Sequence, residues 1–304
     1  MQNIFEIFKQ KFIDQKLSTN SHSKKLTKGF SLVELAIVIL IIGILVVGVS
    51  QGYNVVRSAQ ISNARGITAK SPIPSFEDLY LWYETSLKNS FLESEQKNTG
   101  QITKWKDISP ASILNSYNIS STTATNNITY LASGINKIPA IYFSGTGSKL
   151  TLSGFTQGAS SQTTIFIVFR PTYSPTATYL TLFDNSTASN YSISINNSSV
   201  QLNNGTTANF STVFNLNQDY IIACYFNRGS SQVFVNSLTS LGTASLTGTN
   251  SLVGATIGNS FAGTASFNGL ISELVVYNKV IKEAERKEIF YYLNKKYKID
   301  VTGI

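Results

Sequence analysis

The sequence predicts a mainly β protein, an antiparallel β-sandwich preceded by one long N-terminal α-helix. Two observations lead to this fold class. An uninterrupted apolar block occupies 30–49, and no proline follows it before residue 72. At about residue 75 the chain changes to short β-branched and aromatic runs separated by Gly, Asn, Ser and Thr. These runs recur roughly every dozen residues, which is typical of all-β sandwiches and barrels.

The composition is that of a globular chain, because 42% of the 304 residues are hydrophobic and 13% are charged. The formal net charge of +8 suggests a nucleic-acid partner, but six lysines lie before residue 30 beside two acids. The remaining charge is weak and scattered, so we expect no nucleic acid. The one cysteine, Cys224, lies in an apolar run and the one histidine, His22, in the basic leader. With one cysteine and with its one histidine in the leader, the chain can form neither a His/Cys metal cluster nor a histidine-based triad.

The N-terminal region combines a lysine-rich leader with the apolar block. The block carries a single charge, Glu34, and is long enough to cross the ~30 Å hydrocarbon core of a bilayer. A secretory signal peptide is the competing interpretation, but its apolar region is shorter, ~7 to 15 residues, and the chain has a poor cleavage site at 48–50. Because lysines crowd the N-terminal flank, the positive-inside rule places residue 1 in the cytoplasm and the bulk of the chain outside.

The helix is expected to continue from the apolar block to about Lys70, where Pro72 and Pro74 stop it. A second helix is predicted at 281–293, which has good helix formers and early acids, with Lys295, Lys296 and Lys298 following to match the macrodipole. We expect this C-terminal helix to pack on the sandwich.

The strands are predicted from the β-branched and aromatic runs. The run 164–169 has no polar alternation, so we place it centrally in a sheet. The Asn/Ser/Thr-rich stretch 186–212 is interpreted as polar strand faces and turns. Examples of the strand-forming runs are 140–143, 163–170, 179–183, 191–195, 219–226, 232–235 and 270–277.

The start of the apolar block carries the most specific motif. A carboxylate inside an apolar twenty-mer costs roughly 2.5 to 3.5 kcal/mol at the helix centre and less near its end, so Glu34 needs a partner. The segment KGFSLVEL (28–35) resembles the class III leader of type IV pilins and pseudopilins, a resemblance that covers 24–60. It implies that a prepilin peptidase cleaves between Gly29 and Phe30, that Phe30 is N-methylated, and that the helix assembles with other pilin-like subunits.

Cleavage would leave a cationic amine on Phe30, which Glu34 of a neighbouring subunit can neutralise, so that Glu34 sets the assembly register. The alternative is a plain transmembrane anchor whose Glu34 reaches the headgroups, which leaves the Gly29-Phe30 pair unexplained. Gly48 and Gly52 form a GxxxG pair, which either lets helices approach closely or softens the helix.

The remainder of the chain also resembles a known family. Its ordered segments resemble bacterial laminin-G-like, concanavalin A-like domains over 76–299, which implies a jelly-roll sandwich. The chain departs from that family at Glu84-Thr85-Ser86, where Asp-Ala-Ser is usual, and after Asp107, where a Ser-Gly turn is usual. The segments are LYLWYETS (79–86), QITKWKDIS (101–109), KIPAIYFSG (137–145), TIGN (256–259) and LISELVVYN (270–278).

The candidate ligand residues of this domain follow from the resemblance. Some members of the superfamily bind glycans with Ca²⁺, and Asp184 is the acid to consider for calcium, against its interpretation as a solvated loop acid. Calcium needs six to eight oxygen ligands, and we expect no other cofactor. Trp82 and Trp105 are candidates for stacking on a sugar, against their interpretation as core aromatics.

Catalysis is not expected. Glycoside hydrolysis needs two carboxylates ~5 to 9.5 Å apart across the scissile bond. The glucanases of this superfamily carry theirs as Glu-x-Asp-x-x-Glu, a pattern that does not occur here, and the only acids within 110–272 are Asp184 and Asp219. Serines and threonines lack the usual histidine base.

The sequence thus predicts three parts: a cytoplasmic basic leader that is cleaved (1–29), a pilin-like transmembrane and assembly helix (30–70), and an extracytoplasmic laminin-G-like sandwich with a C-terminal helix (71–304). The expected function is that of a minor pilin-like or pseudopilin subunit of a type IV pilus-type filament that displays an adhesion domain. The alternatives are a pseudopilin of a type II secretion or DNA-uptake machine, and a membrane-anchored glycan-active protein.

The expected partners are prepilin peptidase, other pilin-like subunits, and a glycan or surface protein as ligand. The expected location is the bacterial inner membrane, crossed once with the N-terminus inside. From there the protein would enter a cell-surface filament or a periplasmic pseudopilus.

Overall fold

A computed structural model describes residues 31–113, 117–121, 127–156, 162–173 and 178–304. The chain divides into two compact units, 1–54 and Val55–Ile304. Helix α2 (Leu32–Ala69) contributes its apolar part to the first unit and its last turns to the second. The domain boundaries expected from the sequence stay predictions.

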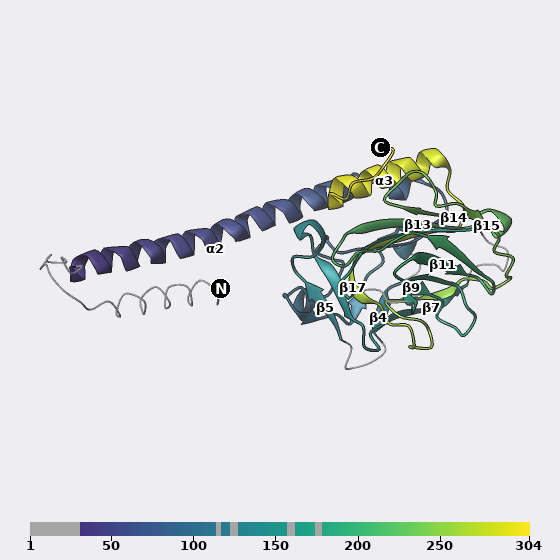
Figure 1. Ribbon diagram of the computed structural model, residues 1–304, viewed down its shortest axis with the longest axis horizontal. Helices are drawn as coiled ribbons and strands as arrows, with labels where there is room; N and C mark the ends of the chain where they lie inside the picture. Colours follow the sequence, from purple (N-terminus) through teal and green to yellow (C-terminus); the bar gives the residue numbers. More distant parts are fainter. Residues whose placement is uncertain (1–30, 114–116, 122–126, 157–161, 174–177) are drawn as a thin grey trace, which may run out of the picture. The chain divides into compact units, whose positions relative to one another are not determined.

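The second unit is a β-sandwich of two antiparallel sheets, which confirms the predicted fold class (Figure 1). Within the described residues, one sheet has nine strands and the other has eight. In order across the nine-stranded sheet lie β15 (Thr243–Ala244), β14 (Ser231–Val235), β13 (Tyr220–Phe226), β8 (Thr163–Pro171), β17 (Asn268–Tyr277), β6 (Ala140–Ser144), β5 (Ile128–Leu131) and β2 (Gly100–Gln101), with β1 (Leu79–Glu84) also paired to β17. In order across the eight-stranded sheet lie β12 (Thr207–Ser211), β11 (Ser199–Asn203), β10 (Ser192–Ile195), β9 (Leu180–Asp184), β16 (Val253–Ile257), β7 (Leu150–Thr156), β4 (Ile119–Ser121) and β3 (Lys104–Trp105).

Strand β8 is buried on both of its faces. Ile165 and Ile167 point into the main core between the sheets, whereas Phe166 and Val168 belong to a second core on the outer face of the nine-stranded sheet. A strand covered on both sides has no polar face, which explains the missing alternation in its sequence. The central position predicted for this run is confirmed.

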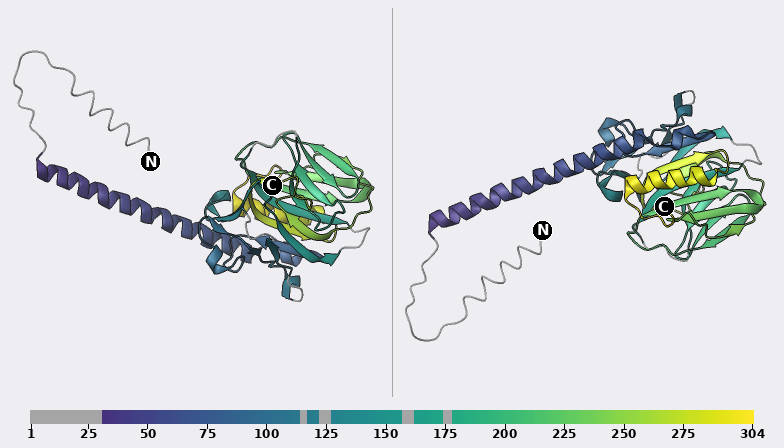
Figure 2. Two further views of the ribbon diagram at one scale, coloured as in Figure 1. Left: turned by 90° about the horizontal axis from the view of Figure 1, so that it is seen from below. Right: turned by 90° about the horizontal axis from the view of Figure 1, so that it is seen from above.

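The second core exists because helices cover the outer face of the nine-stranded sheet. Helix α3 (Glu283–Tyr297) lies across the strands, as the right view of Figure 2 shows, and the predicted C-terminal helix is confirmed. Its Phe290 ring packs edge-on against Phe166 of β8, with ring centroids 5.7 Å apart. Ala64 and Ile73 complete this core from the end of α2 and the segment that follows it. Short 3₁₀ helices in the described part are η2 (Ile73–Ser75), η3 (Glu93–Glu95), η4 (Pro110–Ile113), η5 (Ile135–Lys137) and η6 (Arg228–Ser230).

Gly258, in the TIGN segment, occupies a position that has no room for a side chain. Gly258 has φ +82°, and a Cβ there would lie 2.2 Å from the ring of Phe143. A side chain at this position would therefore be strained in its backbone and would clash with the core. The next residue, Asn259, fixes the loop by donating to the Ser266 hydroxyl at 2.8 Å and accepting from the Ser260 and Ala265 amides.

Candidate functional site

The N-terminal end of α2 is closed by reciprocal hydrogen bonds between Ser31 and Glu34. The Ser31 hydroxyl accepts from the amides of Val33 and Glu34 at 3.2 and 3.4 Å, and the Ser31 amide donates to Glu34 Oε2 at 2.7 Å. This is a capping box, in which two otherwise unpaired donors of the helix end are satisfied. The S-x-x-E spacing is readable in the sequence, where we interpreted Glu34 as the partner of another subunit's amine or as a residue that reaches the headgroups, and not as part of a cap. Gly29 and Phe30 lie outside the described residues.

The residues after the capping box form an exposed apolar surface. Within the described residues, Leu32–Val49 is long and apolar enough to cross a membrane, and none of it is buried. Ile41 and Leu45, on consecutive turns, are 51% and 60% exposed. A helix that is apolar all round needs lipid or other apolar helices around it. The stretch therefore needs an apolar environment that the rest of the described chain does not provide.

A buried ionic network lies beneath α3. The ammonium of Lys296 donates to Glu84 Oε2 at 2.9 Å and to Glu273 Oε2 at 2.8 Å, and the three side chains are at most 1% exposed. Glu84 and Glu273 are direct cross-strand partners of β1 and β17. Two like charges opposite each other destabilise a sheet, so the lysine between them is what allows the pair.

Hydrogen bonds satisfy the remaining oxygens of both carboxylates. Glu273 accepts from the Trp82 indole at 2.7 Å, from the Tyr292 hydroxyl at 2.9 Å and from the Tyr297 hydroxyl at 2.8 Å. Glu84 accepts from the amides of Ser86 and Leu87 and from two serine hydroxyls. Buried charges are tolerated only with this degree of pairing.

The network favours the charged forms of Glu84 and Lys296. Burial alone would raise the pKa of Glu84, but Lys296 and the hydrogen bonds from Ser86 and Leu87 bring that pKa below its ordinary 4.5. Burial alone would lower the pKa of Lys296, but Glu273, Glu84 and two tyrosines raise it well above its ordinary 10.5. In the sequence, Lys296 stands only as a basic residue near the end of the last helix, and no local pattern indicates that it is buried.

The end of α2 is tied to the same network. The Thr68 hydroxyl lies 3.4 Å from the Tyr292 hydroxyl and 3.5 Å from that of Ser86, and Arg65 Nε donates to the Ser86 carbonyl at 2.7 Å. Thr68 is buried. The network therefore joins the last turns of α2, strands β1 and β17, and α3.

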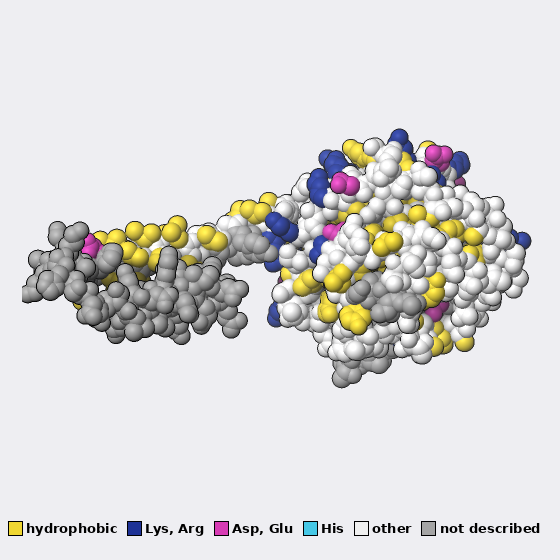
Figure 3. Space-filling model, in the orientation of Figure 1, with side chains coloured by type: hydrophobic (Ala, Val, Ile, Leu, Met, Phe, Trp, Pro, Cys, Tyr) yellow, Lys and Arg dark blue, Asp and Glu magenta, His cyan; other side chains and the backbone are white. Residues whose placement is uncertain are grey.

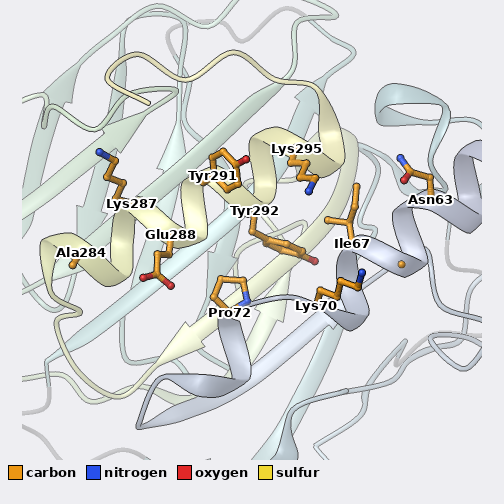
Figure 4. A pocket seen from close by; sticks show the side chains of 11 residues that line it. Asn63, Ile67, Lys70, Pro72, Ala284, Lys287, Glu288, Tyr291, Tyr292 and Lys295 are labelled. Carbon is orange, nitrogen blue, oxygen red and sulfur yellow. The ribbon is translucent and has the colours of Figure 1, made fainter.

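A pocket of about 740 Å³ is lined by residues from the end of α2, the segment after it and α3 (Figure 4). Tyr292 belongs to both the network and the pocket, because its ring lines the pocket and its hydroxyl reaches Glu273. Lysines and one acid lie around an apolar base. The lining residues are Asn63, Gly66 and Ile67 of α2, Lys70 and Pro72 after it, and Ala284, Lys287, Glu288, Tyr291, Tyr292 and Lys295 of α3.

Asp184 lies at the end of β9 and is buried, so its interpretation as a solvated loop acid is wrong. Its carboxylate accepts from the amides of Asn185 at 2.8 Å and Phe261 at 2.9 Å, which ties two loops together. Burial raises its pKa against the effect of these amides. The described residues contain no group of three or more His, Cys, Asp or Glu that could hold a metal ion. The calcium role of Asp184 stays a prediction.

Neither tryptophan presents a ring to solvent. Trp82 is 5% exposed and donates to Glu273, and Trp105 is fully buried and donates to the Glu84 carbonyl at 2.8 Å. The Trp105 ring packs against Tyr83 and Phe91. Sugar stacking by these residues stays untested, but in the described conformation their rings belong to the core. Cys224 is fully buried, as its apolar run predicted, and burial raises its pKa.

Comparison with known families confirms both resemblances. Residues 24–50 match the model of the prokaryotic N-terminal methylation motif. Residues 144–285 match the model of the concanavalin A-like lectin/glucanases superfamily. A comparison with curated protein sequences gives no match.

Solved structures share the sandwich fold at low sequence identity. The binding domain of paraclostridial mosquitocidal protein 1 aligns with a TM-score of 0.52 and 13% identity, over 72% of this chain and 52% of that one. A sialidase of Trypanosoma rangeli in complex with sialic acid aligns with a TM-score of 0.50 and 13% identity, over 74% of this chain but 34% of the sialidase. Domain 4 of a GH43 extracellular arabinanase from Geobacillus stearothermophilus aligns with a TM-score of 0.46 and 17% identity, over 70% of this chain and 98% of that domain.

The two alignments with TM-scores of 0.50 and 0.52 agree with the sandwich built from the strand pairing, while the methylation motif accounts for the capped apolar helix in front of it. The chain therefore carries a prokaryotic N-terminal methylation motif, of the kind found in pilin-like proteins, ahead of a concanavalin A-like domain.

Proposed function

We propose that this protein is a minor subunit of a type IV pilus-type filament and displays its sandwich for adhesion. The single observation that carries the proposal is the methylation motif at 24–50, placed at the start of an exposed apolar helix. A helix of this kind is stable in a bilayer before assembly and among like helices afterwards. The sandwich is large for a simple repeating subunit, which favours a minor or tip position.

The proposal includes processing and topology. A prepilin peptidase cleaves between Gly29 and Phe30 and Phe30 is N-methylated, after the chain has inserted once into the inner membrane with its leader inside. Mass analysis of the mature N-terminal peptide tests this step. Methylated Phe30 is the expected terminus, and Gly29→Val is expected to retain the leader. A mature chain that still contains Lys28 would refute the proposal.

Glu34 has two roles under this proposal, and the capping box lets them be separated. Within the subunit its carboxylate accepts from the Ser31 amide, and between subunits it neutralises the Phe30 amine. Glutamine can replace the first interaction, because Gln also forms capping boxes, but it carries no charge for the second. Leucine replaces neither.

The decisive experiment compares Glu34→Gln, Glu34→Leu and Ser31→Ala in sheared surface filaments and in the membrane. Both Glu34 variants are expected in the membrane, cleaved, and strongly depleted from the filament. Ser31→Ala, which weakens only the cap, is expected to assemble nearly normally. Filament levels of Glu34→Gln equal to wild type would show that the charge plays no part in assembly.

Display for adhesion is supported by the outer face of strands β10, β11 and β12. The side chains on this face are uncharged and polar, and no helix of the described chain covers them. We propose a glycan or a surface protein as the ligand. The pseudopilin of a secretion or DNA-uptake machine has the same N-terminal motif, so the cell fraction decides between them: sheared surface filaments favour the pilus and a periplasmic location favours the pseudopilus.

We propose that the protein is not an enzyme, although it shares its fold with a sialidase. Glycoside hydrolysis usually needs two carboxylates that reach the substrate. Glu84 and Glu273 are paired in space, but both are buried and held by Lys296. Incubation with a fluorogenic sialoside and with arabinan is expected to release no product. Turnover that survives purification and disappears on mutation of a single side chain would support the membrane-anchored glycan-active protein instead.

A further inference from the structure

The pocket between α2 and α3 combines an apolar base with a basic rim. Ile67 and Pro72 form apolar parts of its wall, and Lys70, Lys287 and Lys295 surround it against one acid, Glu288. Figure 3 shows that charged side chains gather around α3, whereas the surface below it is mostly uncharged. The pocket thus fits a protein segment that presents an apolar side chain beside a carboxylate.

Such a segment is present on the chain itself. Leu92 is 42% exposed, and the next residue, Glu93, is exposed as well. They begin η3, just before the edge strand β2. The buried Glu95 holds this turn, since its carboxylate accepts from the Leu92 amide at 3.3 Å and from the Thr103 amide at 2.8 Å. A turn that is already fixed loses little conformational entropy when it binds.

We propose that the pocket receives the Leu92-Glu93 turn of a neighbouring copy of this chain. Leu92 would contact the apolar base, and Glu93 would lie among Lys70, Lys287 and Lys295. The exposed ring of Tyr291, 55% accessible, would be covered by the contact.

The contact joins two different surfaces, because the turn precedes the edge strand β2 and the pocket lies on the helices of the outer face. A repeated contact between unlike surfaces generates a ring or an open helical assembly, whereas a contact between like surfaces closes a dimer. The inference rests on the proposed filament function and adds to it an interface between sandwiches.

Disulfide trapping in the assembled filament tests the contact. Two differently tagged full-length chains are expressed together, one with Lys295→Cys and the other with Glu93→Cys. The native Cys224 is fully buried and gives little background. After mild oxidation, a disulfide-linked pair carrying both tags is expected. The matched control replaces Lys295→Cys by Ser211→Cys, on an exposed position of β12 in the other sheet, and is expected to give no pair.

Reversing the charges of Glu93 and Lys295 gives a second, independent test of the contact. Glu93→Lys alone and Lys295→Glu alone are each expected to reduce filament incorporation about tenfold, because they place like charges together. The two changes in one chain restore opposite charges and are expected to recover most of the loss. A variant that is merely misfolded would not recover in this way.

The outcomes separate the interface from the function. Filaments with methylated Phe30 but no Lys295–Glu93 disulfide above the Ser211 control would overturn the interface and leave the proposed function standing. A disulfide from Lys295→Cys to a different filament subunit would overturn the choice of a second copy. Absence of any filament fraction, with Phe30 unprocessed, would overturn both proposals.

Discussion

The outer faces of the two sheets differ in what covers them. On the nine-stranded sheet, α3 and the last turns of α2 cover a second hydrophobic core, in which Phe166, Tyr225 and Phe290 are buried. On the eight-stranded sheet, the outward positions of β10, β11 and β12 are filled by polar uncharged side chains. These are Ser192, Ser194, Ser199, Gln201, Asn203, Thr207, Asn209 and Ser211.

The two faces also differ in charge. Three charged side chains are buried at the covered face, whereas the outward side chains of β10, β11 and β12 are uncharged. The polar face needs no special pairing, because water and neighbouring side chains satisfy it, as when the Gln201 amide donates to Asn209 at 3.1 Å. The covered face buries Glu84, Glu273 and Lys296, which are stable only as a set. Changes to the set should therefore cost far more free energy than changes to the open face.

Removing the central cation should have the largest effect. Lys296→Met leaves Glu84 and Glu273 buried opposite each other without a partner, and we expect the free energy of unfolding to fall by about 3 to 5 kcal/mol. The matched control is Lys295→Met, one position away and exposed, with an expected change within about 0.5 kcal/mol. Denaturant unfolding can be followed by the fluorescence of Trp82 and Trp105, both buried in the sandwich. Equal effects of the two variants would show that the network contributes nothing to stability.

The same variant should reverse the pH dependence of stability. In the wild type the lowered pKa of Glu84 contributes stability above about pH 4.5 that is lost as pH falls through the folded pKa. The raised pKa of Lys296 contributes stability below about pH 10.5 that is lost as pH rises through the folded pKa. In Lys296→Met, protonation relieves the buried carboxylates, so the deficit relative to wild type should shrink below pH 4.5. Unfolding curves measured from pH 3 to 7 check this, and a constant deficit would contradict it.

Removing one hydrogen bond to the network should have an intermediate effect. Tyr292→Phe deletes the hydroxyl that donates to Glu273 at 2.9 Å and accepts from Lys296 at 3.1 Å. Hydrogen bonds to charged groups contribute about 1.5 to 3 kcal/mol, and we expect a loss of this size. Tyr291→Phe, on the exposed side of the same helix, is the control with no expected change. A loss in both variants would point to a general effect on α3.

A charge placed on the open face should have the smallest effect. Asn209→Lys on β12 is expected to change the free energy of unfolding by no more than about 0.5 kcal/mol, because the side chain remains in water. The same residue placed at Ala223 of β13, fully buried in the second core, is expected to prevent folding. Thermal unfolding of both variants makes the comparison. A severe effect of Asn209→Lys would show that the eight-stranded sheet is covered in the native protein.

Local sequence patterns were sufficient for the two long helices and for the strands with pronounced β-branched or aromatic runs. The run 164–169 was predicted as a central strand because it has no polar alternation, and β8 is buried on both faces. The run 281–293 was predicted as a helix from its formers and end charges, and α3 begins at Glu283. The methylation motif was found because its residues are contiguous, and the family comparison confirms it. Cleavage at Gly29 and the register role of Glu34 remain predictions.

The sequence by itself determined what depends on neighbours along the chain: the apolar helix, the strand periods, and the capping box that Ser31 and Glu34 form three residues apart. Only the tertiary structure decided which charges are buried. Glu84 and Glu273 are far apart in sequence and become partners through the register of β1 and β17. Lys295 is exposed and Lys296, the next residue, is buried. Which of the two lysines points into the interior depends on the rotation of α3 on the sheet. No local pattern contains that rotation, since it follows from how the whole apolar face of the helix packs on the strands beneath it.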